Sequence, residues 1–117
     1  MHELPITRQL LKHILEVARQ HGGRRVRAAH LVIGDLTSYM DDAVQFYFDI
    51  LSRGTLAEGA RLVIRREPGQ ARCLDCGHPF PVTLPLPLGC PQCKSPRLEI
   101  TGGDACRLEA VELEDAS

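Results

Sequence analysis

The chain has 117 residues, of which 44% are hydrophobic and 25% charged, a composition that is ordinary for one globular domain or a domain with a small satellite. Its formal net charge of −1 excludes the overall basic field that would point to nucleic acid or a membrane surface. No apolar run reaches the roughly 20 residues that span a bilayer, and the first residues lack the pattern of a secretory signal. We therefore expect a cytosolic protein, whose five cysteines are metal ligands rather than disulfides.

The first two elements are expected to be a helix and a strand. Ile6, Leu10 and Ile14 recur at the helical period, which predicts a helix over residues 4–21 that the following Gly-Gly pair ends. Residues 25–33 alternate in the manner of a strand.

A second helix and a second strand follow. Asp41 is a natural N-cap for a helix that runs to about Arg53. Its apolar stripe is expected to comprise Val44, Tyr47, Phe48 and Leu51. The strand is expected over residues 61–67.

The character of the chain changes in residues 71–101, whose first part is rich in Cys, Pro and Gly. Strands are expected at 98–101 and 106–113, with a bulge near Ala110 where the alternation of the last strand slips. If this last strand returns to the first sheet, the cysteine-rich module is an insertion. The predicted fold class is α+β, with two helices packed on a small three-stranded sheet and an inserted zinc-ribbon-like module.

Four cysteines of this module form the pattern C-x2-C-x13-C-x2-C, made by Cys73, Cys76, Cys90 and Cys93. Each pair can form a tight turn that directs two sulfur atoms at one point, and four thiolates suit tetrahedral zinc. Because four thiolates leave no open position, the zinc would be structural, and its binding would accompany folding of the module. Two unrelated redox pairs are the alternative.

Two further residues could contribute to metal binding. His78 can be a bystander, a partner of a ligand or a replacement ligand, and we expect a bystander. Cys106 lies in strand-like sequence, which favours a buried apolar cysteine over a fifth ligand.

The chain begins Met1-His2-Glu3, which offers a second kind of metal site. The amine of Met1 and the backbone nitrogen and imidazole of His2 can reach one ion together. The amide nitrogen of Glu3 could complete a four-nitrogen plane, or its carboxylate could bind axially. Such nitrogen-rich tetragonal sites suit Ni(II) or Cu(II). The alternative is an exposed histidine at a frayed chain end.

These features together resemble the hydrogenase nickel-incorporation proteins of the HypA/HybF type. The resemblance extends from Met1 to about Glu114 and rests on the initial MHE, the segment LVIGDLTSYM, the paired CLDC and CPQC motifs, and the closing CRLEAVELE. It implies a nickel metallochaperone that delivers Ni(II) during maturation of [NiFe]-hydrogenase. It also implies nickel bound at His2 and its neighbours and structural zinc on the four cysteines.

The resemblance further implies the organisation and partners of the protein. Residues 1–70 and 102–117 would form the nickel-binding domain and 71–101 the zinc module. Asp41 matches a position that lies near nickel in some relatives, although a capping role would also explain it. The implied partners are a nickel-handling GTPase of hydrogenase maturation and the hydrogenase large subunit, with self-association and without nucleic acid or membrane.

Two other classes of function compete with this hypothesis. A zinc ribbon that binds nucleic acid or protein would use Arg61, Arg65, Arg66 and Arg72. The near-neutral charge and the lack of interleaved aromatic residues oppose nucleic-acid binding. An enzyme could use Asp41 and Asp42 as acid and base, but the sequence contains no nucleophile elbow, phosphate loop or open zinc site. We therefore expect a protein that is not an enzyme.

Overall fold

A computed structural model of the chain describes residues 3–115, and this part contains two helices and six strands. In chain order they are α1 (Glu3–Gln20), β1 (Val26–Gly34), α2 (Asp41–Leu51), β2 (Arg61–Glu67), β3 (Gly69–Cys73), β4 (Pro79–Val82), β5 (Leu98–Thr101) and β6 (Cys106–Leu113). Both expected helices and the four expected strands are confirmed, with small shifts at their ends. No helix within residues 3–115 has the length and apolar character needed to cross a membrane.

The chain divides into two compact units. Within the described part, residues 3–32, 39–65 and 106–115 form the helical unit, and residues 33–38 and 66–105 form the cysteine unit. The cysteine unit is therefore larger than the module expected at 71–101.

Backbone hydrogen bonds explain why residues 33–38 belong to the cysteine unit. The amide of Asp35 donates to the carbonyl of Glu67 at 2.8 Å, and the amide of Leu36 donates to the carbonyl of Gly103 at 2.7 Å. The two segments of the chain approach so closely here that a Cβ added to Gly34 would lie 2.1 Å from the carbonyl oxygen of Gly103. Because this pairing joins segments that are far apart in the sequence, the local sequence pattern did not indicate that residues 33–38 belong to the cysteine unit.

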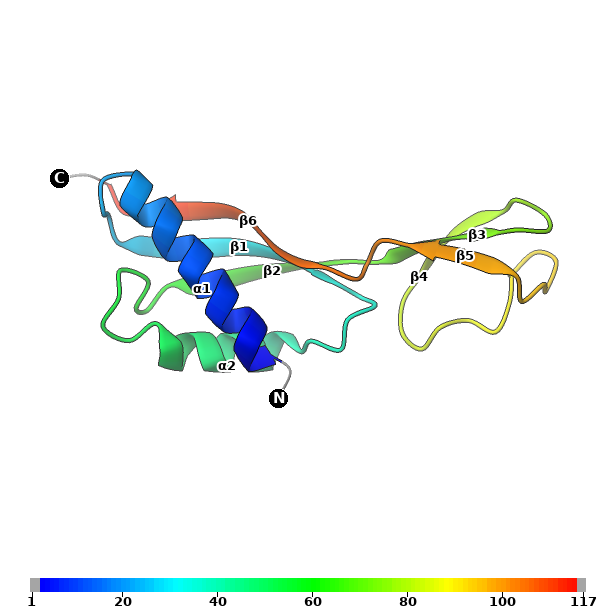
Figure 1. Cartoon of the computed structure of the whole chain (residues 1–117), viewed down its shortest axis with the longest axis horizontal. Coiled ribbons are helices and arrows are strands. Elements are labelled where there is room, and N and C mark those ends of the chain that lie inside the picture. Colours follow the sequence, from blue (N-terminus) through cyan, green and yellow to red (C-terminus); the bar gives the residue numbers. More distant parts are fainter. Residues whose placement is uncertain (1–2, 116–117) are drawn as a thin grey trace. The chain divides into compact units, whose positions relative to one another are not determined.

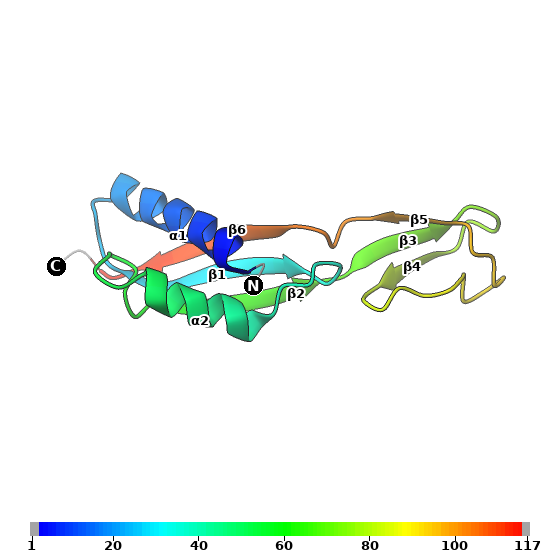
Figure 2. The same cartoon turned by 60° about the horizontal axis from the view of Figure 1, so that its bottom comes forward.

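The helical unit is a three-stranded sheet in the order β2-β1-β6, with α1 and α2 side by side against it (Figure 1; Figure 2). Strand β6 thus returns to the first sheet, as expected. The core lies between sheet and helices because each helix turns one apolar face inward. Its side chains with no exposed surface include Ile14, Ala18, Val32, Val44 and Phe48. The predicted α+β fold is confirmed.

The start of α2 differs from the prediction. Met40, not Asp41, is the N-cap residue, with extended φ −100° and ψ 130° and no capping bond from its own side chain. Instead the carboxylate of Glu3, in α1, accepts the amide of Met40 at 3.0 Å. Asp41 is the first helical residue, where a negative charge favours the positive end of the helix dipole. The capping prediction was wrong because the helix begins one residue earlier than expected, with Asp41 already inside its first turn.

The cysteine unit contains a second three-stranded sheet, in the order β4-β3-β5, with β3 antiparallel to both neighbours. Strands β3 and β4 were not predicted. In β4, Pro79 and Pro81 obscure the strand pattern. A strand at the edge of a sheet tolerates proline because one side of it makes no ladder bonds. β4 is such an edge strand, which explains why two prolines fit there.

Candidate metal centre

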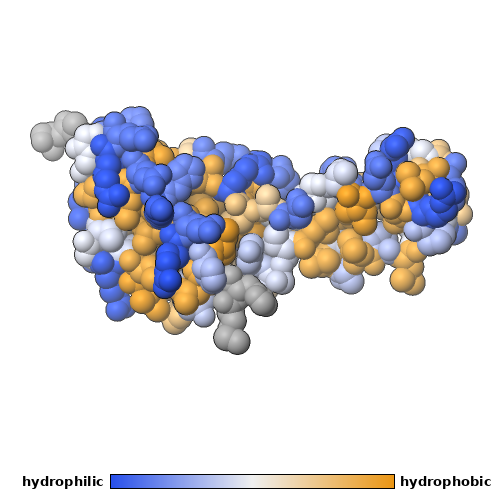
Figure 3. All heavy atoms as spheres, in the orientation of Figure 1, coloured by the Kyte–Doolittle hydropathy of each residue, from blue (hydrophilic) through white to orange (hydrophobic). Residues whose placement is uncertain are grey.

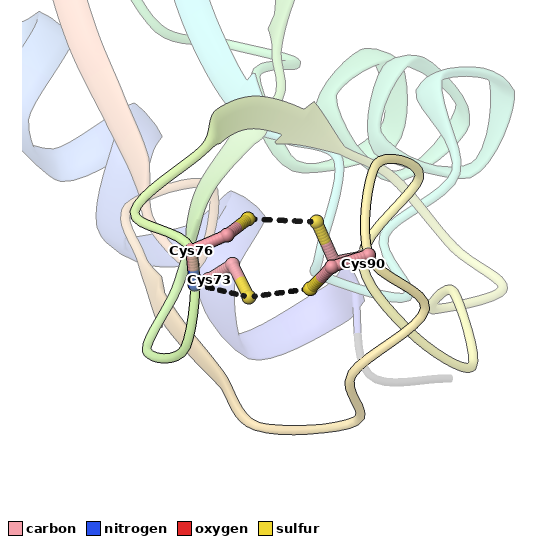
Figure 4. A group of neighbouring side chains, drawn as sticks. Cys73, Cys76 and Cys90 are labelled. Carbon is pink, nitrogen blue, oxygen red and sulfur yellow. Dashed lines mark hydrogen bonds between the residues drawn. The ribbon is translucent and has the colours of Figure 1, made fainter.

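Two turns of the cysteine unit bring the four cysteine side chains together. Cys73 ends β3 and Cys76 follows in the next turn, while Cys90 and Cys93 flank a turn between β4 and β5. All four sulfur atoms lie within 4.8 Å of one another. Figure 4 shows the side chains of Cys73, Cys76 and Cys90 converging from two loops.

The spacing of these sulfur atoms fits one tetrahedral ion. The sulfur atoms of Cys73 and Cys93 are 3.5 Å apart, and those of Cys76 and Cys90 are 3.7 Å apart. A tetrahedral ion with metal–sulfur bonds of about 2.3 Å would separate its sulfur ligands by about 3.8 Å. The four cysteines therefore form a cluster that could hold a metal ion.

In both turns a backbone amide points at the sulfur of the first cysteine, from three residues further on in the first turn and from two in the second. The amide of Cys76 points at the sulfur of Cys73 at 3.4 Å, and the amide of Gln92 points at the sulfur of Cys90 at 3.3 Å. The residues that follow, Gly77 and Lys94, have positive φ of 80° and 67°. The glycine makes this conformation easy in the first turn, whereas Lys94 adopts it as a non-glycine residue. Backbone amides thus favour the thiolate form of both sulfur atoms in each pair.

The thiol pKa values reflect this arrangement. The amide of Cys76 is the largest influence on Cys73 and lowers its pKa to about 6, against the opposing effect of burial. At Cys76 the amide of His78 favours the thiolate, but burial and the neighbouring sulfur atoms together raise the pKa to about 12. Four adjacent thiols cannot all ionise without a cation. A bound metal ion would therefore displace protons, and its binding should weaken as the pH falls.

A polar cluster joins the two cysteine turns. The carboxylate of Asp75, between the first two cysteines, accepts hydrogen bonds from the Ser95 hydroxyl and from Nη1 of Arg97, the latter at 2.8 Å. The Arg97 amide donates to the Ser95 hydroxyl at 3.1 Å, and the amide of Leu74 donates to the Arg97 carbonyl at 2.8 Å. We call Asp75, Ser95 and Arg97 the knuckle brace. Sequence analysis missed it, although the acidic residue inside a CxxC turn was a usable signal.

His78 and Cys106 lie outside the four-sulfur cluster. The His78 ring stacks on Phe80, with ring centroids 5.8 Å apart, which agrees with the expected bystander role. Cys106 begins β6 in the helical unit and is half-buried rather than buried. Among the described residues, the only group of three or more candidate ligands is the four-cysteine cluster.

The candidate nickel residues Met1 and His2 lie outside the described residues. Glu3 is the first residue of α1, and its side chain is buried, with 5% of its surface exposed. The Thr7 hydroxyl, also buried, donates to the Glu3 carbonyl at 2.5 Å.

Arginines that could support a nucleic-acid contact face carboxylates. Arg65 contacts Glu109 at 2.7 Å and Arg66 contacts Asp35 at 3.0 Å. These pairs reduce the positive potential that phosphates would need.

Comparison with known proteins identifies the family. The sequence model of the family described as "Hydrogenase/urease nickel incorporation, metallochaperone, hypA" matches residues 1–113. The chain belongs to the HypA family. It is 40% identical over 117 residues to the hydrogenase maturation factor HypA of Dehalococcoides mccartyi strain 195, covering all of this chain and 98% of the relative. It is 42% identical over 114 residues to that of Geobacter metallireducens, covering 97% of this chain and all of the relative.

Solved HypA structures share the fold. The solution structure of the Ni metallochaperone HypA from Helicobacter pylori matches with a TM-score of 0.64 and 22% identity, covering 95% of this chain and 96% of the other. A second HypA solution structure matches with a TM-score of 0.68 and 24% identity, covering 97% of both. The resemblance inferred from the sequence motifs is thereby confirmed, and the chain is a member of a hydrogenase-maturation, nickel-metallochaperone family.

Proposed function

We propose that this HypA chain carries Ni(II) at its N-terminus, delivers it during maturation of [NiFe]-hydrogenase, and holds structural zinc on Cys73, Cys76, Cys90 and Cys93. The observation that supports this most directly is the family match, which includes residues 1–113 and therefore the initial Met-His-Glu segment. It is a role in metal transfer rather than in catalysis.

The proposed nickel ligands are the imidazole and backbone nitrogen of His2, with Met1 and Glu3 supplying further backbone nitrogen atoms. Nitrogen-rich tetragonal sites suit Ni(II). One structural feature supports this proposal: Glu3 is the first residue of α1 and is the neighbour of His2 along the chain. A site at a chain terminus can also exchange its ligands one at a time with an acceptor protein.

The proposed role of zinc is to hold the cysteine unit together. Four thiolates complete the coordination of a tetrahedral zinc ion and leave no position for a substrate. The sulfur spacings of 3.5 and 3.7 Å support zinc, because they are close to those of a tetrahedral thiolate site.

The partners follow from the same proposal. A nickel-handling GTPase would act with this protein before nickel reaches the hydrogenase large subunit, in the cytoplasm. Self-association also stays a prediction. Binding of the purified GTPase, measured with and without nickel, tests the first of these partners.

Metal analysis of untagged protein tests the nickel proposal. We expect one tightly held zinc and one removable Ni(II) per chain, with His2→Ala abolishing the nickel and leaving the zinc. His13→Ala is a matched control, because His13 is an exposed histidine further along α1. An N-terminal extension that displaces the amine should also impair nickel uptake. Full nickel stoichiometry in His2→Ala would refute the assignment. An equal loss of nickel in His13→Ala would show that the site is not specific to His2.

A further inference from the structure

We propose that the end of the helical unit at which α1 finishes binds a short acidic segment of a partner protein, in which apolar residues lie beside Asp or Glu. The site is a cavity of about 470 Å³, which we call the arginine pocket. Its lining includes Arg19, Arg25, Leu15, Leu56, Thr55 and Glu58. The inference does not depend on nickel, because none of these residues belongs to the first turn of α1.

The two arginines of the pocket differ from the paired arginines elsewhere in the chain. Arg65, for example, contacts the carboxylate of Glu109 at 2.7 Å, which balances its charge. At the pocket, Nη2 of Arg25 donates to the backbone carbonyl of Glu58 at 3.1 Å, and a carbonyl carries no net charge. Arg19 is an exposed residue in the last turn of α1. Because a guanidinium group stays charged at physiological pH, both side chains can attract a carboxylate.

One carboxylate of the chain lies at the same pocket, and it is directed at the backbone. Oε1 of Glu58 accepts the amide of Gly54 at 2.7 Å. Its single negative charge opposes the charges of the two arginines but does not cancel them. The pocket therefore has a net positive charge, which is complementary to an acidic segment.

Hydrogen bonds hold the wall of the pocket that follows α2. The amide of Val26, at the start of β1, donates to the carbonyl of Leu56 at 2.8 Å, and the amide of Glu58 donates to the carbonyl of Thr55 at 3.2 Å. The Thr55 hydroxyl donates to the carbonyl of Ser52 at 2.6 Å. A wall that is ordered before binding reduces the entropic cost of forming the complex.

The apolar side chains of the pocket indicate which kind of anion fits. Leu15 is 9% exposed and Leu56 is half-buried, and both line the same cavity as the arginines. A protein segment with carboxylates beside leucine-like side chains complements both kinds of surface. Nucleic acid fits less well, because its phosphates bind through many positive charges and the formal net charge of this chain is −1.

Fluorescence anisotropy of a labelled peptide on the full-length, zinc-loaded protein tests the proposal. The probe is a peptide of alternating Glu and Leu, and its counterpart has Gln in place of every Glu. We expect saturable binding of the Glu peptide that added salt weakens, and about tenfold weaker binding of the Gln peptide. Replacing Arg19 and Arg25 together by Gln should weaken binding of the Glu peptide by about tenfold.

A control and a third variant separate this role from a general effect of charge or folding. The control replaces Arg8 and Lys12 by Gln, since both are exposed on α1 outside the pocket, and should change binding by less than about twofold. Glu58→Gln keeps an oxygen that can accept the Gly54 amide but removes the opposing charge, so it should strengthen binding about threefold. Loss of structure would not produce tighter binding. Circular dichroism shows whether each variant has folded.

Several results would overturn the inference. One is the absence of saturable binding of the Glu peptide by the wild-type protein up to about 1 mM. Others are an equal loss of binding in the control protein and weaker binding in Glu58→Gln. Displacement of the peptide by an oligonucleotide or by inorganic phosphate at similar concentration would assign the pocket to phosphate groups instead. Nickel stoichiometry, measured on the same variants, should be unchanged, so failure of this inference is distinguishable from failure of the proposed function.

Discussion

The helical unit and the cysteine unit differ in where their leucines lie, which are buried or half-buried in the first and mostly exposed in the second. In the helical unit Ile14, Val44 and Phe48 have no exposed surface. In the cysteine unit Leu84 is 50% exposed and Leu88 97%, and Figure 3 shows hydrophobic residues at the surface of this unit. Its interior includes two of the sulfur-bearing side chains, Cys73 and Cys90, each 1% exposed.

This comparison shows two ways of stabilising a small fold. Apolar burial contributes about 25 cal/mol for each Å² removed from water, which suffices for two helices packed on a sheet. A unit that leaves its leucines outside lacks most of this contribution, and structural zinc can supply on the order of 10 kcal/mol instead. We therefore expect the cysteine unit to depend on metal and the helical unit to be independent of it.

The largest effect should come from breaking the four-cysteine cluster. Cys90→Ser, or removal of zinc by a chelator, should unfold the cysteine unit while the helical unit keeps its structure, because the apolar core of the latter is intact. Amide hydrogen exchange resolved by residue, together with zinc analysis, measures both units at once. Cys106→Ser is the matched control, since Cys106 lies outside the cluster and should leave zinc content unchanged. If the amides of the cysteine unit stay protected from hydrogen exchange without metal, this unit does not depend on metal and the expected difference between the two units is absent.

A core substitution in the helical unit should give the converse result. Phe48→Ala removes a side chain with no exposed surface and should lower the free energy of unfolding of this unit by about 3–5 kcal/mol. Phe46→Ala, at a side chain that is 60% exposed, should change it by less than about 0.5 kcal/mol. Denaturant unfolding followed by circular dichroism measures both variants. An equal loss of unfolding free energy in the two variants would contradict the placement of Phe48 in the core and of Phe46 at the surface.

The knuckle brace tests how much of the cysteine unit is organised without metal. Asp75→Ala removes the carboxylate that accepts hydrogen bonds from Ser95 and Arg97, and should weaken zinc binding by about tenfold, the lower end of the usual effect of partners around a metal site. Competition with a chromophoric chelator measures this affinity. Glu99→Ala, whose carboxylate on β5 is 3.8 Å from Arg72, is a control that should change the affinity little. An unchanged affinity in Asp75→Ala would show that the metal alone organises the two turns.

The smallest effect should come from an exposed ion pair of the helical unit. A hydrogen bond from His30 lowers the pKa of the Glu112 carboxyl below its ordinary value of 4.5. Because the folded-state pKa is lowered, the pair stabilises the fold above pH 4.5 and loses this effect as the pH falls further.

Comparison of two variants measures this contribution. In Glu112→Gln the free energy of unfolding should depend slightly less on pH between pH 5 and 3 than in the wild-type protein, as denaturant unfolding at each pH would show. Glu114→Gln is the control at an exposed neighbouring position and should match the wild-type protein. A steeper pH dependence in Glu112→Gln would contradict the sign of the pKa shift.

Much of the fold could be predicted from local pattern. The bounds of β2, β5 and β6 agree with the expected strands, because regular alternation and flanking turn residues mark a strand within a few residues. The last strand also loses its alternation where expected, since Glu109 and Ala110 are both exposed. The four cysteines could be grouped from spacing alone, because two short turns restrict where their sulfur atoms point.

Three features depended on contacts between distant segments. Strand β4 is stable because β3 pairs with it, placing Pro81 opposite Gln70, although its own sequence reads as a proline-rich loop. Residues 33–38 join the cysteine unit through the carbonyls of Glu67 and Gly103. The amide of Met40, at the start of α2, donates to a carboxylate 37 residues away.

By itself the sequence determined the helices, most strands, the grouping of the four cysteines and the family, since each depends on the order and spacing of neighbouring residues. Only the tertiary structure decided that Glu3 contacts Met40, that Asp75, Ser95 and Arg97 join the two cysteine turns, and that the cysteine unit begins before its first cysteine. The physical reason is that hydrogen-bond donors and acceptors must be satisfied by whichever group lies nearest in space, and the sequence does not state which distant segment that will be.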